Sequence, residues 1–382
     1  MGLMKAALGS VGSVLGDQWR EYFYCDSMPE NVLVTKGQKR TTSRSSNMKL
    51  FVAIPTVVQA WKKFMTEEVR AYLEDRFEVT YFPLERRLTA EDIALYAGDA
   101  EVIMTGWGHP MMDSKSLENT SIKLIAHTGG SVADYVAQDV YETGIKVISG
   151  NEMYAESVAE GVVGYMMLAL RKMVDYVQDT RNGNWRSEAC APTEGLLDQT
   201  IGLVGMGAIT RHLIPMLKPF RVKLKLYSGY PIDPEYLAQN NAVQASLEEI
   251  FSTCKIVSIH SALNDRTKGM IGKEHFDLLQ DGAVFINTAR GAIIREDEMI
   301  EALQTKRFMA VLDVYSKEPP EVDSPLRQLN NVYCMPHMGG PTNDRAPIIA
   351  MRLAEDVLRF SEGKPLQYEI TGEYAKRMTK QR

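Results

Sequence analysis

Three polar segments in the C-terminal half of the chain carry the side-chain types that reduction of a carbonyl compound requires. Each follows a short apolar run that we expect to be a strand, and the segments are Asn287-Thr-Ala-Arg290-Gly291, Asp313-Val-Tyr-Ser-Lys-Glu318-Pro319 and Met335-Pro336-His337-Met338-Gly339-Gly340. Open α/β sheets bind ligands at the carboxyl ends of their strands, so these segments predict one common site.

The chemistry of three side chains in these segments suits a 2-keto acid. His337 can give and take a proton near neutral pH, as reduction of a carbonyl oxygen and its reversal require. Glu318 could orient the imidazole and favour its protonated form, and Arg290 offers a planar fork of donors for a carboxylate. Singly, each has an ordinary structural alternative: a hydrogen-bonded histidine, a capping or paired arginine, a loop carboxylate. Together at strand ends they favour catalysis.

A glycine turn predicts a nucleotide phosphate site. An apolar run enters Gly205-Met206-Gly207, and a helical pattern starts at Ala208 and Ile209. Such a turn lets a pyrophosphate approach the backbone at a helix N-terminus. Thr210 stands where the usual motif has its third glycine, which weakens the match, and a plain tight turn is the alternative. Pro215 predicts a short or kinked helix.

The choice of dinucleotide stays open. The next expected strand ends in Leu-Tyr-Ser228, where an acidic residue would normally bind the adenosine ribose. Ser228 does not repel a 2′-phosphate, and no arginine follows to attract one. We therefore expect NAD, with NADP possible.

The pattern of elements predicts an α/β protein with two Rossmann-like lobes, each a doubly wound parallel sheet, and a cleft between a substrate lobe and a nucleotide-binding lobe. Length alone favours about two domains. Helical patterns over 64–75, 89–97, 134–143, 154–180 and 344–361 separate the runs. The expected strands are 49–54, 77–81, 102–104, 122–126, 146–149, 200–205, 222–227, 256–260, 283–287, 310–314 and 332–335.

The first 47 residues differ from the rest. Residues 35–47 are polar and basic, as in a linker, before the strand-like run that starts at Met48. Residues 1–47 resemble the start of SPFH-domain proteins, some of them described as virion core proteins. Only that opening fragment is present, so we interpret it as a leader or fusion that contributes no function.

Composition narrows the class of protein. The formal charge of −6 argues against a nucleic-acid partner, which would need a basic face. No apolar run approaches the roughly 18 residues that span a bilayer, so we expect no membrane partner. Four scattered cysteines without metal-ligand spacing predict reduced thiols, no metal and a cytoplasmic location.

At the three polar segments the sequence resembles the D-isomer-specific 2-hydroxyacid dehydrogenase family, over about residues 48–370. The family includes phosphoglycerate, glycerate, D-lactate and glyoxylate/hydroxypyruvate enzymes. The resemblance implies Arg290, Glu318 and His337 as the catalytic set. It also implies a flavodoxin-like substrate domain, residues 48–150 plus 341–370, and an NAD(P)-binding Rossmann domain, residues 151–340.

The same resemblance implies further contacts. For the cofactor they are Gly205, Met206, Gly207, Ala208, Ile209, Ser228, His260, Thr288, Ala289, Asp313 and Gly339. For the substrate they are Trp107, Thr128, Gly129, Gly130, Arg290 and His337, and His109 is a possible wall of the pocket. Ser131 and Ala133 depart from the family's substrate loop. Packing is an alternative for Trp107, His109 and His260.

The resemblance implies an oxidoreductase that moves a hydride between NAD(P)H and a small 2-keto acid or D-2-hydroxy acid, within a homodimer. The alternative is a corepressor-like NAD(H) sensor on the same fold with little or no turnover. The sequence leaves open which 2-hydroxy acid is used.

Overall fold

The computed structural model describes residues 47–185, 187 and 192–380. The leader, residues 1–46, and the cysteines Cys25 and Cys190 lie outside the described residues. Within the described part, no helix is long and apolar enough to cross a membrane. The same part holds no group of three or more histidine, cysteine or acidic side chains arranged to bind a metal ion.

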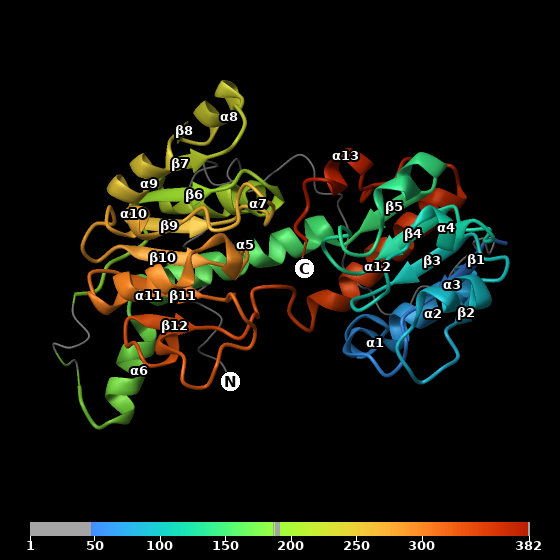
Figure 1. The fold of residues 1–382 in the computed structure, drawn as a ribbon, viewed down its shortest axis with the longest axis horizontal. Coiled ribbons are helices and arrows are strands. Elements are labelled where there is room, and N and C mark those ends of the chain that lie inside the picture. Colours follow the sequence, from blue (N-terminus) through green and yellow to red (C-terminus); the bar gives the residue numbers. More distant parts are fainter. Residues whose placement is uncertain (1–46, 186, 188–191, 381–382) are drawn as a thin grey trace, which may run out of the picture. The chain divides into compact units, whose positions relative to one another are not determined.

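The first sheet has five parallel strands in the order β2-β1-β3-β4-β5 (Figure 1). This confirms the five strands expected before residue 150. The order reverses between β1 and β3, which makes that point the crevice of the sheet. The strands are β1 Lys49–Val52, β2 Glu78–Tyr81, β3 Val102–Thr105, β4 Leu124–His127 and β5 Lys146–Ser149.

Both faces of this sheet are covered, because alternate residues of a strand point to opposite sides. Leu50 and Val52 of β1 pack into one core with residues of α1, α2 and α12. Phe51 packs into a second core with Ile93 of α3. Strands buried on both faces read as continuous apolar runs, which is why these strands are recognisable in the sequence.

The second sheet has seven parallel strands in the order β12-β11-β10-β9-β6-β7-β8. Its order reverses between β6 and β9, so the crevice lies beyond the ends of these two strands. The short strand β8 was not anticipated. The strands are β6 Thr200–Val204, β7 Lys223–Tyr227, β8 Ala242–Gln244, β9 Ile256–Ile259, β10 Val284–Asn287, β11 Met309–Leu312 and β12 Val332–Cys334.

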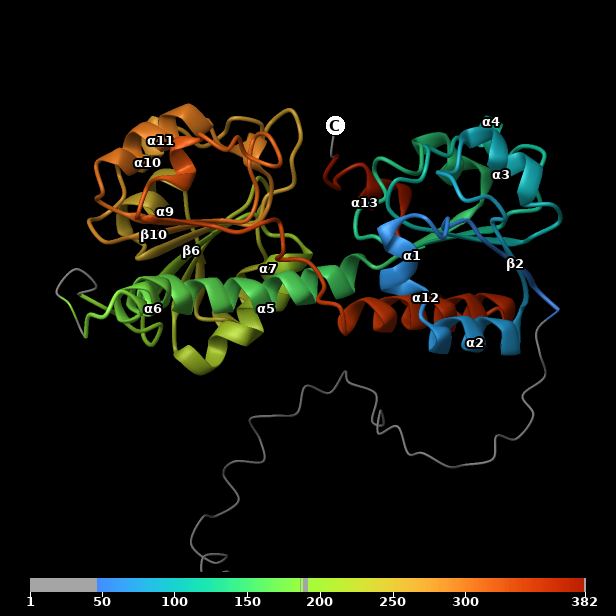
Figure 2. The same ribbon diagram turned by 90° about the horizontal axis from the view of Figure 1, so that it is seen from below.

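Two long helices accompany the sheets (Figure 2). The helix α5 contacts β10 and β11 of the second sheet, and α12 contacts β4 of the first, so the chain returns to the first sheet after residue 340. The helices are α1 Gln59–Phe64, α2 Glu67–Arg76, α3 Ala90–Tyr96, α4 Ser114–Leu117, α5 Asn151–Leu170, α6 Met173–Arg181, α7 Ala208–Leu217, α8 Pro234–Gln239, α9 Leu247–Thr253, α10 Lys273–Phe276, α11 Glu296–Gln304, α12 Arg345–Ser361 and α13 Gly372–Ala375. The 3₁₀ helices are η2 Gln138–Thr143, η4 Lys218–Phe220, η5 Gly291–Ile293 and η6 Pro325–Arg327.

Three helix predictions were wrong in detail. The expected helix 154–180 is two helices, because Lys172 takes a left-handed backbone conformation with φ +47° between α5 and α6. The expected helix 64–75 is divided between α1 and α2. The expected helix 134–143 is only the 3₁₀ helix η2, because Val136 pairs with Met112 in an isolated β-bridge.

Candidate active site

A histidine–glutamate pair stands at the end of the second sheet. His337 follows β12, and its Nδ1 lies 2.6 Å from Oε2 of Glu318, which follows β11. The other oxygen of Glu318 accepts a hydrogen bond from the backbone amide of Tyr315 at 3.1 Å. The carboxylate is therefore held at one end and orients the ring at the other. The His337 side chain remains 48% exposed and accessible to a small molecule.

Asp313 forms hydrogen bonds with the backbone of the segment that directly follows His337. Its side chain is 2% exposed, and its two oxygens accept hydrogen bonds from the amides of Met338 and Gly339, each at 2.8 Å. The hydroxyl of Tyr165, on α5, donates a third hydrogen bond at 3.3 Å. Asp313 was expected to serve the cofactor, but in this structure its carboxylate is engaged with the backbone beside His337. Sequence reasoning missed Tyr165, which lay unmarked within an apolar helical pattern.

Two carboxylates influence the charge of Arg290. Burial lowers the pKa of its guanidinium, and the negative charges of Glu318 and Asp134 oppose that shift. Glu318 is the partner of His337, whereas Asp134 follows the Gly129-Gly130 loop of the first sheet. The guanidinium of Arg290 is therefore influenced by one charge from the histidine–glutamate pair and by another that follows the loop expected to bind the substrate.

Gly291 determines how closely the arginine and glutamate segments approach each other. A Cβ placed on Gly291 would lie 1.9 Å from the carbonyl carbon of Tyr315. No larger residue fits there without a backbone shift. Because Gly291 has no side chain, the segment after β10 can pack directly against the segment after β11. This packing also places Arg290 near Glu318.

The glycine turn has the geometry of a phosphate site. Gly205 has φ +113°, and a Cβ on it would lie 2.6 Å from the backbone nitrogen of Ser261, so only glycine suits this position. A Cβ on Gly207 would meet no atom within 4 Å, and no side chain caps the helix that begins after it. The first amides of α7, starting at Ala208 and Ile209, are consequently available to an anion.

Thr210 replaces the third glycine of the usual motif without loosening the turn. Its hydroxyl donates a hydrogen bond to the carbonyl oxygen of Gly205 at 2.5 Å, and its side chain is fully buried. The threonine therefore closes the turn by itself at the position where the usual motif has its third glycine. The helix α7 does contain Pro215 and ends two residues later, as expected for a short helix.

Buried polar atoms without a partner line the ends of the neighbouring strands. Both ring nitrogens of His260, after β9, and Oγ1 of Thr288, after β10, have no hydrogen-bond partner among the described residues. Burial lowers the pKa of His260 to about 3, so its ring is neutral. Such orphaned groups beside an open glycine turn fit a polar dinucleotide, which would supply their hydrogen bonds. Ser228 follows β7, with its Oγ accepting from the amide of Tyr230.

The loop after β4 is held by hydrogen bonds from one backbone amide and two hydroxyl groups. The carbonyl oxygens of Gly129 and Gly130 accept hydrogen bonds from the amide of Gly150 and the hydroxyl of Ser149. The hydroxyl of Thr128 donates to the carbonyl oxygen of Thr105, and a Cβ on Gly129 would lie 3.0 Å from Nε1 of Trp107. The expected substrate residues of the first sheet are therefore neighbours of one another.

Two parallel α/β sheets, a glycine turn between β6 and α7, and a histidine–glutamate pair near a partly buried arginine define a nicotinamide-dependent dehydrogenase. Residues 163–339 match the model of the D-isomer specific 2-hydroxyacid dehydrogenase, NAD binding domain. The chain is 30% identical over 242 residues to a hydroxypyruvate reductase of Thermotoga maritima, covering 63% of this chain and 78% of the relative. The chain belongs to the D-isomer-specific 2-hydroxyacid dehydrogenase family, and the matched domain is the family's NAD-binding domain.

Two further likenesses agree with the family. A human glyoxylate reductase/hydroxypyruvate reductase is 28% identical over 255 residues, which cover 65% of this chain and 77% of that enzyme. The apo structure of D-mandelate dehydrogenase from Rhodotorula graminis has the same fold, with a TM-score of 0.72 at 20% identity over 85% of this chain and 97% of its own. The resemblance of residues 1–47 to SPFH-domain proteins and the corepressor alternative receive no support from these comparisons.

Proposed function

We propose that this protein reduces a small 2-keto acid to the D-2-hydroxy acid with NADH or NADPH, and catalyses the reverse oxidation. The observation that carries the proposal is the 2.6 Å contact between His337 and Glu318, whose negative charge acts on the partly buried guanidinium of Arg290. A proton donor, its orienting carboxylate and a carboxylate receptor are the groups that this reaction requires besides the hydride carrier.

Each of these residues has a distinct role. The bound nicotinamide supplies or accepts the hydride. His337 holds the proton at Nε2, because its Nδ1 is engaged by Glu318, and delivers it to the carbonyl oxygen. Arg290 binds the substrate carboxylate and polarises the carbonyl. The backbone amides of Gly129 and Gly130 hold the same carboxylate beside Thr128, whose own amide donates to the carbonyl oxygen of Thr105. Trp107 forms the adjoining wall.

The residues that would hold the cofactor lie at the carboxyl end of the second sheet. The turn from Gly205 to Ile209 would hold the pyrophosphate, and Ser228 would contact the adenosine ribose. The remaining cofactor contacts are His260, Thr288, Ala289 and Gly339, whereas Asp313, which was also expected to contact the cofactor, holds the amides of Met338 and Gly339. We expect NAD to be preferred, with NADP also accepted, because Ser228 neither binds the ribose as strongly as a carboxylate nor repels a 2′-phosphate.

We further propose that residues 48–150 plus 341–370 form the substrate domain, that residues 151–340 form the nucleotide domain, and that a cleft separates them. The protein is a cytoplasmic homodimer joined through the nucleotide domain. The helix α6 supports this assembly, because it has no buried residue and exposes Met173, Val174 and Val177. Exposed apolar side chains on one helix suit burial against a second copy.

The proposal is tested by measuring the oxidation of NADH and of NADPH with a 2-keto acid as the substrate. The acids are glyoxylate, pyruvate, hydroxypyruvate, phenylpyruvate and 3-phosphohydroxypyruvate. We expect turnover with at least one acid, and chiral analysis of the product identifies the D isomer. Cofactor binding without turnover of any acid would contradict the proposed reaction. Absence of cofactor binding would contradict the nucleotide site as well.

A further inference from the structure

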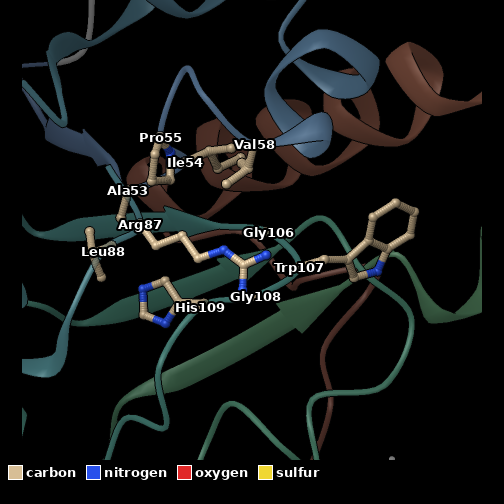
Figure 3. A pocket seen from close by; sticks show the side chains of 10 residues that line it. All are labelled: Ala53, Ile54, Pro55, Val58, Arg87, Leu88, Gly106, Trp107, Gly108 and His109. Atoms are coloured by element: carbon tan, nitrogen blue, oxygen red, sulfur yellow. The ribbon is translucent and has the colours of Figure 1, made fainter. Parts of the chain in front are cut away.

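A pocket opens at the crevice of the first sheet, beyond the carboxyl ends of β1 and β3 (Figure 3). The proposed function uses only Trp107 of its lining residues and leaves Arg87 without a role. Its walls come from the segment after β1, the segment before α3 and the segment after β3. The lining residues are Ala53, Ile54, Pro55, Val58, Arg87, Leu88, Gly106, Trp107, Gly108 and His109.

Arg87 is the single charged side chain among these lining residues, and none of them is a carboxylate. No described residue forms an ion pair or a side-chain hydrogen bond with its guanidinium. The adjacent Arg86 differs, since it makes two hydrogen bonds of 2.6 and 2.8 Å to the buried carboxylate of Asp92. One arginine therefore anchors the segment, and the other extends toward the residues from Gly106 to His109 (Figure 3).

The pocket adjoins the loop expected to hold the substrate carboxylate. A Cβ on Gly106 would lie 3.3 Å from Oγ1 of Thr128, and Nε1 of Trp107 lies within contact distance of Gly129. A substituent that extends from a carboxylate held at Gly129 toward Trp107 would therefore approach this pocket. Lys63 stacks over the Trp107 ring at 5.5 Å, but its ammonium donates to the carbonyl oxygen of Pro341.

His109 adds an uncharged polar group to the wall. Its Nδ1 donates to the carbonyl oxygen of Pro110 at 2.7 Å, so its buried Nε2 is an acceptor without a partner among the described residues. Burial lowers the pKa of His109 to about 4, and the ring is therefore neutral at physiological pH. The positive charge that the pocket presents is consequently that of Arg87.

We propose that Arg87 is a specificity-determining residue that selects 2-keto acids whose substituent ends in a second anionic group, either a carboxylate or a phosphate. The inference rests on the proposed function, because the substrate must place its first carboxylate at Gly129 and Arg290. The guanidinium of Arg87 is exposed and unpaired beside a small pocket that holds no carboxylate, and a bound anion would supply the charge-assisted hydrogen bond that no described residue provides.

The test compares matched substrates in which the second anion is present or absent. The pairs are 2-ketoglutarate with 2-ketovalerate, and 3-phosphohydroxypyruvate with hydroxypyruvate. We expect the wild-type kcat/KM to favour the anionic member of at least one pair, and the pair concerned distinguishes carboxylate from phosphate. In Arg87→Gln that ratio should fall about tenfold, the effect of losing one charged hydrogen bond. Arg87→Lys should keep part of it.

Lys62→Gln is the matched control, because Lys62 is an exposed cation on α1 that does not line the pocket. In Lys62→Gln the ratio of kcat/KM between the two members of each substrate pair should equal that of the wild type. An equal ratio in Arg87→Gln and the wild type, with turnover intact, overturns the role of Arg87 and leaves the proposed function standing. Absence of turnover with every acid overturns the proposed function and this inference with it.

Discussion

The carboxylate of Asp313 accepts a hydrogen bond from the backbone amide of Gly339 at 2.8 Å, and this contact secures the segment that carries His337. The approach is so close that a Cβ on Gly339 would lie 2.7 Å from Oδ2 of Asp313. Asp313 is thus a positioning residue for the proton donor in this structure.

We predict that Asp313→Asn lowers kcat by about 10- to 100-fold, because a neutral amide cannot accept hydrogen bonds at both positions and leaves a buried donor unsatisfied. The affinity for NADH, measured by fluorescence titration, should change much less. Tyr165→Phe is the milder control, since it removes one hydroxyl and keeps both amide contacts. Weakened NADH binding with an unaltered kcat would contradict this role and favour contact between Asp313 and the nicotinamide.

His337→Ala should lower kcat by a factor of about 10² to 10⁴, the usual contribution of a positioned acid or base. The dissociation constant for NADH should stay close to that of the wild type, because the imidazole acts on the substrate. Steady-state kinetics and a binding titration on the same preparation separate the two effects. A wild-type rate in this variant would rule out the proposed mechanism.

Arg290→Lys keeps the charge but loses the planar fork of donors. We expect kcat/KM for the 2-keto acid to fall about 10- to 100-fold, because at least one charge-assisted hydrogen bond is lost. Thermal unfolding should change little, as the lysine retains the positive charge near Glu318. Unchanged substrate affinity would be inconsistent with a carboxylate contact at this residue.

Three buried histidines predict a loss of stability in mild acid. Burial lowers the pKa values of His109, His127 and His260 to about 4, 3 and 3. Because these values lie below the roughly 6.5 of an unfolded histidine, the unfolded chain binds protons first as the pH falls. Their stabilising contribution is complete above about pH 6.5 and declines as the pH falls toward the folded pKa values.

At pH 5 we expect a loss of roughly 1–2 kcal/mol per buried histidine relative to pH 7. Urea unfolding without cofactor at the two pH values measures the difference. In His260→Asn the decrease in the free energy of unfolding between pH 7 and pH 5 should be smaller, because this variant lacks the contribution of one of the three histidines. Equal free energies of unfolding at pH 5 and pH 7 would contradict the neutral, buried state of these rings.

Deletion of residues 1–47 should leave turnover and thermal stability unchanged. Both sheets and every proposed site residue follow Met48, and β1 begins at Lys49. Activity assays and thermal unfolding of the shortened chain check this expectation against the full chain. Loss of folded, active protein would show that the leader contributes to the enzyme.

The sequence by itself determined the local features of this protein. Strands buried on both faces appear as apolar runs, so the two parallel sheets are predictable from the pattern alone. Polar segments that follow such strands must meet at one edge of a parallel sheet, and for this reason the sequence predicts that Glu318 and His337 act together. The glycine turn can also be predicted from the sequence, because Gly205 takes a backbone conformation that other residues avoid.

Only the tertiary structure decided which side chains find partners across the chain. Arg86 and Arg87 are identical neighbours in the sequence, yet the packing of one segment against α3 pairs Arg86 with Asp92 and leaves Arg87 facing the pocket. Thr210 closing its own turn and Tyr165 reaching Asp313 were likewise not marked in the sequence pattern. These contacts depend on the distances and orientations between helices, strands and loops. The packing of the core determines these distances and orientations, whereas local propensity and periodicity do not specify them.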